Sequence, residues 1–235
     1  MIEFQNVWKA FGPKVVLRGV SLTVPNGETV FIVGSSGAGK SVLVKHLVGL
    51  LKLDQGQIML EGQDIAQHTE AEFYAVRKKV GYVFQHATLF DSMTVLENVA
   101  LPIRKHFRVS FQEARDRALA KLELVQLGPY AGRYPAELSA GMQKRVAIAR
   151  TLTLEPPYVI YDEPTTGLDP VAARRVDALI KDLQKKVGVT SLVVSHDLTS
   201  IFSVADRLAM LYKGQFLLNG TPQDFRRSDH PVVQQ

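Results

Sequence analysis

The 235-residue sequence contains no cysteine and no long hydrophobic run. Without cysteine the chain can form neither a disulfide bond nor a thiolate metal site, which is typical of proteins in a reducing cytoplasm. A membrane-spanning helix needs about 20 mostly apolar residues, and the apolar stretch 42–51 is interrupted by Lys45 and His46. The first twelve residues, MIEFQNVWKAFG, lack the basic end and the apolar run of a secretory signal. We therefore expect a chain that neither spans a membrane nor is exported.

The sequence also lacks any dense block of charge. Its formal net charge is +5 and its pI is about 9.4, but basic and acidic residues are interspersed, which favours a solvated surface over a nucleic-acid site. The six histidines show no ligand-like spacing, so we predict no structural metal. The length and the 46% hydrophobic content indicate one compact unit, with room for an inserted subdomain.

The apolar pattern predicts two kinds of sheet. Apolar and polar residues alternate up to the turn at Pro25-Asn26-Gly27, which indicates half-buried antiparallel strands. Continuous apolar runs follow, with helical stretches between them, and this alternation predicts a parallel sheet. The expected strands are 29–33, 158–161 and 191–194, the expected helices are 40–51 and 171–187, and a hairpin is expected around Lys213-Gly214.

Residues 87–149 differ from the sheet-forming segments, because their pattern predicts mostly helix, with an amphipathic stretch at 111–127. This region interrupts the sheet-forming segments. We therefore interpret it as an inserted helical subdomain.

Residues 34–41, GSSGAGKS, match the pattern GxxxxGK[ST] between a predicted strand and a predicted helix. Glycines let the backbone curl so that successive N–H groups face a phosphate, and the helix N-terminus adds partial positive charge. Lys40 is expected to reach the β- and γ-phosphate oxygens, and Ser41 to supply an oxygen ligand to Mg²⁺. The predicted nucleotide contacts in this region are Gly34, Ser35, Ser36, Gly37, Ala38, Gly39, Lys40, Ser41 and Val42.

Two adjacent carboxylates, Asp162 and Glu163, follow the apolar strand 158–161. They emerge at the carboxyl edge of a parallel sheet, where open α/β folds bind ligands. We assign Asp162 to Mg²⁺, through water, and Glu163 to the attacking water as a general base. Up to this point an ATPase, a GTPase and a small-molecule kinase all remain open.

Residues 138–145, LSAGMQKR, resemble the LSGGQ signature of ABC ATPases, shortly upstream of the Asp-Glu pair. Ser139 is expected to cap a helix, and its hydroxyl and an exposed Gly141 amide would form a second anion site, too distant to serve its own phosphate loop. The resemblance implies two copies facing head to tail, each sandwiching ATP between its phosphate loop and the other's signature. Ala140 and Met142 depart from the usual glycine and glutamine.

The resemblance extends over the whole chain and implies roles for four further residues. Gln85 matches the glutamine that touches Mg²⁺ or the attacking water, and Asp169 matches the aspartate that reports across the dimer. His196 matches the switch histidine at the γ-phosphate. Phe11 stands where the family stacks an aromatic ring on adenine, ahead of Trp8 as a candidate.

The resemblance implies an α/β phosphate-loop ABC ATPase fold with a mainly parallel core sheet, an N-terminal antiparallel β subdomain and an inserted helical subdomain. A single domain is expected over 1–235, with the nucleotide-binding core at 1–86 and 150–235 and the helical signature subdomain at 87–149. The expected cofactors are ATP and Mg²⁺, the latter held by Ser41, Gln85 and Asp162. The expected partners are a second copy and integral membrane permease subunits, with no direct contact to nucleic acid.

Several strings resemble the ATPases of Mla and Mce lipid-trafficking systems. GKSVLVKH at 39–46 is similar to GKSVLLKH, FQHATLFDSMTV at 84–95 to FQxxALFDSxTV, and ENVALP at 97–102 to ENVAFPL. Met142 also fits this branch. The resemblance implies phospholipid trafficking at the cytoplasmic face of the inner membrane, with an MCE-type lipid-binding protein and a small accessory subunit.

Other functions remain open alternatives. One is an ABC importer or exporter ATPase for another substrate. Another is an ABC ATPase of DNA repair or translation, which is disfavoured because those proteins carry two cassettes or a long coiled coil. A small-molecule kinase would have no use for a signature helix.

The expected permease contact lies within residues 90–103, with Phe90, Met93 and Leu96 as exposed apolar groups. The competing interpretation is that these three side chains pack the core of their own subdomain.

Overall fold

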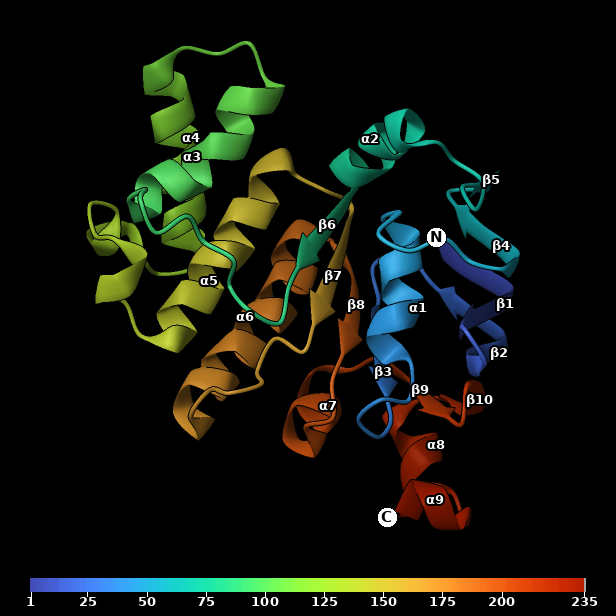
Figure 1. The fold of residues 1–235 in the computed structure, drawn as a ribbon. Coiled ribbons are helices and arrows are strands. Elements are labelled where there is room, and N and C mark those ends of the chain that lie inside the picture. The colour runs from blue at the N-terminus through green and yellow to red at the C-terminus, as the bar shows by residue number, and fades with distance from the viewer. Residues whose placement is uncertain (235) are drawn as a thin grey trace.

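The computed structural model describes residues 1–234 as two sheets surrounded by helices (Figure 1). The N-terminal sheet is antiparallel in the order β2-β1-β4-β5. In its second strand Leu22 and Val24 are buried while Ser21 and Thr23 are exposed, so the predicted half-buried strands are confirmed. The strands are β1 (Ile2–Phe11), β2 (Lys14–Val24), β4 (Gln55–Leu60) and β5 (Gln63–Asp64).

The second sheet has the order β10-β9-β3-β8-β7-β6 and is parallel except for β10, which pairs antiparallel with β9. The predicted parallel sheet and the predicted hairpin are therefore confirmed. Its strands are β3 (Thr29–Val33), β6 (Val80–Val83), β7 (Tyr158–Asp162), β8 (Thr190–Val194), β9 (Arg207–Tyr212) and β10 (Gln215–Gly220).

The parallel sheet buries both of its faces. In β3, Val30 and Ile32 belong to one core with the N-terminal sheet and helix α1 (Lys40–Leu47). Phe31 and Val33 belong to a second core with α6 (Pro170–Val187) and the helical region. This alternation explains why the strand reads as a continuous apolar run.

The inserted region is helical, as predicted: α3 (Val95–His106), α4 (Phe111–Leu124) and α5 (Ala140–Thr151) form one group beside the sheets (Figure 1). The predicted boundary at 149/150 falls inside α5, because the buried residues Ile148, Ala149 and Leu152 continue the same core. Helix α1 ends at Leu47 rather than at 51, since the N–H groups of Val48 and Gly49 both bond the carbonyl of His46.

The remaining helices complete the fold. They are α2 (Glu70–Lys79), α7 (Leu198–Val204), α8 (Pro222–Arg227) and α9 (Pro231–Gln234). Within residues 1–234, no helix combines the length and the apolar character needed to cross a membrane.

Candidate active site

The loop between strand β3 and helix α1 contains three glycines with positive φ: 144° at Gly34, 77° at Gly37 and 104° at Gly39. A Cβ at Gly34 would lie 2.2 Å from the carbonyl oxygen of Leu211, so glycine is required there both by its torsion and by the approach of β9. Residues 35–37 are exposed at the tip. The backbone therefore forms an exposed turn directly before helix α1, and this is the arrangement that the motif predicts.

Lys40 begins α1 with its side chain buried inside this loop. Its Nζ donates hydrogen bonds to the carbonyl oxygens of Gly34 and Ser35, at 2.8 and 2.9 Å. Burial lowers the pKa of Lys40, while the nearby carboxylates of Glu163 and Asp162 oppose that shift. A desolvated ammonium group thus faces the phosphate loop.

Asp162 is buried at the end of β7 between two hydroxyl donors. Ser41 Oγ donates to its Oδ1 at 2.7 Å, and Tyr82 Oη donates to its Oδ2 at 2.8 Å. A serine hydroxyl beside a carboxylate is an oxygen donor set of the kind that Mg²⁺ prefers. The predicted ligand pair Ser41 and Asp162 is therefore together, next to Lys40.

Glu163 follows Asp162 with a backbone φ of 49°, and its N–H bonds the carbonyl of Val194 at 2.9 Å. Thr166 Oγ1 donates to Glu163 Oε2 at 2.9 Å. His196 Nδ1 lies 3.6 Å from the same oxygen, and its side chain is 57% exposed. The two predicted catalytic residues Glu163 and His196 are thus neighbours at the carboxyl edge of the sheet, and Thr166 fixes the carboxylate.

Gln85 lies just beyond β6, and its side chain is exposed. Among residues 1–234, no hydrogen bond joins that side chain to Asp162 or Glu163, so its predicted contact with Mg²⁺ stays a prediction. Its backbone is fixed instead: the buried Lys144 Nζ donates to the carbonyl oxygens of Phe84 and Gln85. Desolvation lowers the pKa of Lys144 to about 8.

The signature residues lie at the start of α5. Ser139 caps this helix, as predicted, with its Oγ accepting the N–H of Met142 at 3.4 Å. Gly141 is buried rather than exposed, because α6 packs on it: a Cβ at Gly141 would lie 2.7 Å from Ala172 Cβ. Asp169 caps α6 and accepts the N–H groups of Val171 and Ala172.

Ser139, Gly141 and Asp169 line one polar hollow of about 330 Å³, together with Arg145 and Arg175. Figure 1 shows the first turn of α5 and the loop before α1 on opposite sides of strands β6 to β8. The signature therefore lies away from the phosphate loop of the same chain. This agrees with the expectation from the sequence.

Phe11 lies at the end of β1 with 46% of its surface exposed, and Lys9 Nζ lies 5.4 Å from its ring centroid. The paired strand β2 packs on the phosphate loop, because Val16 and Leu17 border Gly39. The Trp8 indole N–H is bonded to Asn6 Oδ1. Phe11 is thus the more exposed of the two candidate rings, and its contact with adenine stays a prediction. Of the other predicted contacts, Ala38 and Val42 are partly buried in the core under α1.

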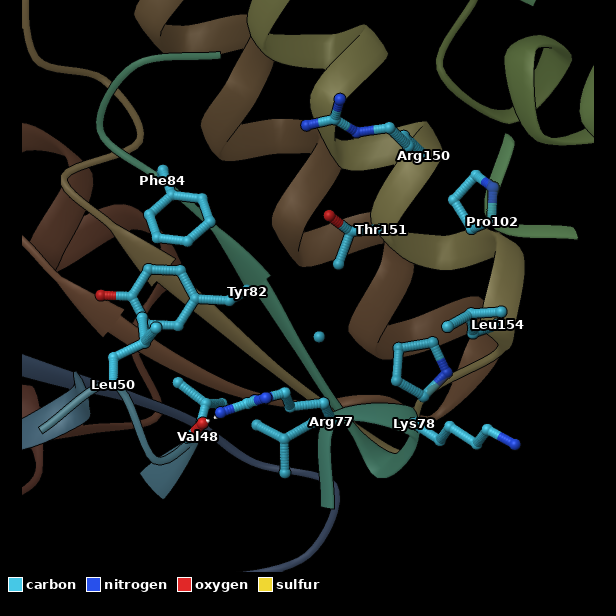
Figure 2. Close-up of a pocket in the computed structure, with 13 residues that line it drawn as sticks. Val48, Leu50, Arg77, Lys78, Tyr82, Phe84, Pro102, Arg150, Thr151 and Leu154 are labelled. Carbon is cyan, nitrogen blue, oxygen red and sulfur yellow. Dashed lines mark hydrogen bonds between the residues drawn. The ribbon is translucent and has the colours of Figure 1, made fainter. Parts of the chain in front are cut away.

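A groove of about 290 Å³ separates the core from the helical subdomain (Figure 2). Figure 2 shows the rings of Tyr82 and Phe84 side by side on one wall, and their centroids are 4.4 Å apart. The other lining residues are Val48, Leu50, Arg77, Lys78, Val80, Gly81, Pro102, Arg150, Thr151, Leu154 and Pro156.

The predicted contact residues of the helical subdomain divide between the two interpretations. Phe90 is 49% exposed, and Arg150 lies over its ring. Met93 is partly buried, and Leu96 packs against the core. Leu96 is therefore a packing residue rather than an exposed one.

Sequence reasoning did not single out two residues that hold the site together, Tyr82 and Lys144. A tyrosine in a buried strand is expected to be a core residue, and a lysine in a helix is expected to be a solvent-exposed charge. Only the tertiary structure brings them to Asp162 and to the backbone at Gln85.

The fold and the site define a nucleotide-binding cassette built on a phosphate loop. The family described as ABC transporter matches residues 17–166, and the chain belongs to this family. The chain is 38% identical, over 235 residues, to the intermembrane phospholipid transport system ATP-binding protein MlaF of Haemophilus influenzae, covering 100% of this chain and 89% of that protein.

The chain is also 38% identical, over 234 residues, to the probable ribonucleotide transport ATP-binding protein mkl of Mycobacterium tuberculosis. That alignment covers 100% of this chain but only 65% of the length of mkl. A solved dimeric ATP-binding cassette in a post-hydrolysis state, bound to ADP and Pi, matches with a TM-score of 0.85 and 34% identity, covering 94% of this chain and 98% of that one. The predicted fold class is confirmed by this match.

Proposed function

We propose that this chain is the ATP-hydrolysing subunit of an ABC transporter. The observation that carries the proposal is the meeting of four groups at one sheet edge: the phosphate loop with Lys40, the Ser41–Asp162 pair, Glu163 and His196. Each group supplies a separate part of phosphoryl transfer to water.

The residues divide this work by position. Lys40 and the loop N–H groups bind the β- and γ-phosphates, and Phe11 stacks on adenine. Glu163 accepts a proton from the attacking water while Thr166 holds its Oε2 in place. His196 donates a hydrogen bond to the γ-phosphate from the same edge.

Ser41 and Asp162 would hold Mg²⁺, with Gln85 reaching it from the loop after β6. The bound ion would offset charge that develops on the phosphate oxygens. The buried setting of Asp162 between two hydroxyl donors supports this assignment.

The composite site needs a second copy of the chain. Ser139 and Asp169 face a hollow away from their own phosphate loop, and a second copy arranged head to tail would bring them to the opposite nucleotide. The solved relative that matches this chain is itself dimeric, which supports this arrangement.

A membrane permease is the proposed partner for the groove of Figure 2. Exposed apolar surface at Leu50 and Phe84 lies beside the cations Arg77, Lys78 and Arg150. A cytoplasmic helix with an apolar face and a carboxylate fits this surface. Binding there would keep the chain at the cytoplasmic face of the inner membrane.

The proposed cargo is phospholipid, in a system with an MCE-type lipid-binding protein and a small accessory subunit. MlaF supports this cargo by its name, and this chain covers 89% of MlaF against 65% of mkl. The name of mkl, ribonucleotide transport, makes a soluble anionic cargo the second candidate.

The test uses the chain purified together with its membrane partner and reconstituted in vesicles of phosphatidylethanolamine and phosphatidylglycerol. We expect ATP-dependent movement of a fluorescent phospholipid, and no ATP-dependent uptake of a radiolabelled ribonucleotide. Movement of the ribonucleotide alone would contradict the lipid assignment and leave the transporter assignment standing.

The same vesicles test the groove. Leu50 lines the groove and is 48% exposed, so Leu50→Glu places a charge in the groove. This variant should abolish phospholipid movement and co-purification with the membrane partner. The chain alone should still bind ATP. Leu124→Glu is the control, since Leu124 is 45% exposed and outside the groove. Equal behaviour of the two variants would show that the partner docks elsewhere.

A further inference from the structure

Tyr82 spans the distance between the groove and the candidate magnesium site. It lies on β6, where it pairs with Ile160 of β7, the strand that ends in Asp162. Its hydroxyl donates to Asp162 Oδ2 at 2.8 Å. Its ring lies against Phe84, with centroids 4.4 Å apart and an interplanar angle of 37°. One side chain thus contacts a proposed metal ligand and a wall of the groove.

The hydrogen bond has one direction. An ionised carboxylate has only acceptor oxygens, so the Tyr82 hydroxyl is the donor in this contact. Asp162 then holds Oδ2 toward Tyr82 and presents Oδ1 to Ser41.

The opposite end of the contact is open to a partner. Phe84 is 37% exposed and lines the groove, and its carbonyl oxygen is held by Lys144. Its backbone is thus anchored while its ring is accessible. A partner that contacts the Phe84 ring would also affect Tyr82, because the two rings lie against each other.

We propose that Tyr82 is a positioning residue that orients Asp162 for Mg²⁺ and transmits contact at Phe84 in the groove to that carboxylate. The inference rests on the proposed role of Asp162 in holding Mg²⁺. Outer-shell hydrogen bonds of this kind orient the groups that bind a metal, and losing one weakens metal affinity by roughly 10- to 100-fold.

The test is Tyr82→Phe, which removes the hydroxyl and keeps the ring against Phe84. In a Glu163→Gln background, which blocks hydrolysis, the melting temperature is followed as Mg²⁺ is titrated at fixed ATP. We expect the Mg²⁺ concentration at the midpoint to rise about tenfold, with the melting temperature in ATP and EDTA unchanged. With Glu163 intact, the KM for Mg²⁺ should rise similarly while kcat at saturating Mg²⁺ stays within about twofold.

Tyr161→Phe is the matched control, because Tyr161 is fully buried on β7 and, among residues 1–234, its hydroxyl makes no hydrogen bond to Asp162. It should leave the Mg²⁺ midpoint unchanged. A Tyr82→Phe midpoint equal to the parent's, or an equal shift in both variants, would overturn the inference.

Two further variants separate the parts of the proposal. Phe84→Leu keeps the Tyr82 hydroxyl but removes the ring contact, and it should shift the same midpoint by about threefold; no shift would overturn the link to the groove. Asp162→Asn should abolish the Mg²⁺ dependence. If it did not, the magnesium role of Asp162 itself would fail, which is a different result from failure of Tyr82→Phe alone.

Discussion

At the scale of single residues, the backbone of Glu163 separates two neighbouring carboxylates. An extended residue would already face away from Asp162, but φ 49° also brings the N–H of Glu163 to Val194 and its carboxylate to Thr166 and His196. A left-handed torsion at a non-glycine residue costs about 1–3 kcal/mol and persists only where its surroundings hold it. Here the torsion goes with the placement of the proposed base beside Thr166 and His196.

Glu163→Gln should lower hydrolysis by about 10²- to 10⁴-fold, because the amide cannot accept the proton of the attacking water. Binding of ATP should change little, since the phosphate loop and Lys40 remain intact. Steady-state turnover and equilibrium binding of a fluorescent ATP analogue check both statements. A variant that hydrolyses ATP at the parent rate would remove Glu163 from the mechanism.

The sequence predicts the positions of those proposed site residues that depend on local geometry. Lys40 and Ser41 follow from a loop between a strand and a helix, and Asp162 from the end of a buried strand. Tyr82 does not follow, because its role depends on a hydrogen bond between different strands. The burial of Gly141 was also missed, since it depends on the packing of α6.

At the scale of elements, the parallel strands were predictable because burial on both faces leaves an uninterrupted apolar run. The boundary of the helical subdomain was not predictable, because helix α5 belongs both to that subdomain and to the nucleotide-binding core. Ser139 caps its N-terminus, while Lys144 near its middle holds the backbone at Phe84 and Gln85. The helix that would serve the opposite nucleotide is thus tied to the loop beside its own.

Helices α6 and α7 are joined by a buried carboxyl group. Ser200 Oγ of α7 donates to Asp177 Oδ2 of α6 at 2.7 Å, while Asp177 Oδ1 has no hydrogen-bond partner among residues 1–234. Burial raises the pKa of Asp177 to about 6, and the charge of Asp197 adds to the shift. Ionisation is therefore harder in the folded chain than in the unfolded chain.

A raised folded-state pKa gives a stability contribution that is full below the unfolded value near 3.8 and is lost as pH rises through about 6. Asp177→Asn should therefore raise the free energy of unfolding at pH 8 by about 2 kcal/mol, with the gain vanishing near pH 4. Urea denaturation at the two pH values measures it. Asp182→Asn, on the exposed side of the same helix, is the control. An equal gain at both pH values would contradict the assignment.

At the scale of the whole molecule, each half of the proposed catalytic machinery lies on a different side of the chain. The phosphate loop, Asp162, Glu163 and His196 gather at one end of the parallel sheet, while Ser139 and Asp169 border a hollow beside the helical subdomain. In the proposed mechanism a single copy would therefore lack a complete site. Two copies arranged head to tail would form two complete sites.

Mixing two defective chains tests whether the site is shared between two copies. Lys40→Ala damages the phosphate loop, and Ser139→Arg damages the signature, so neither variant alone should hydrolyse ATP. A mixed dimer would contain one site with both halves intact and one with both damaged. We predict that the mixture recovers ATP hydrolysis above either variant alone, with a maximum near equal amounts; a mixture no more active than its separate components would contradict the composite site.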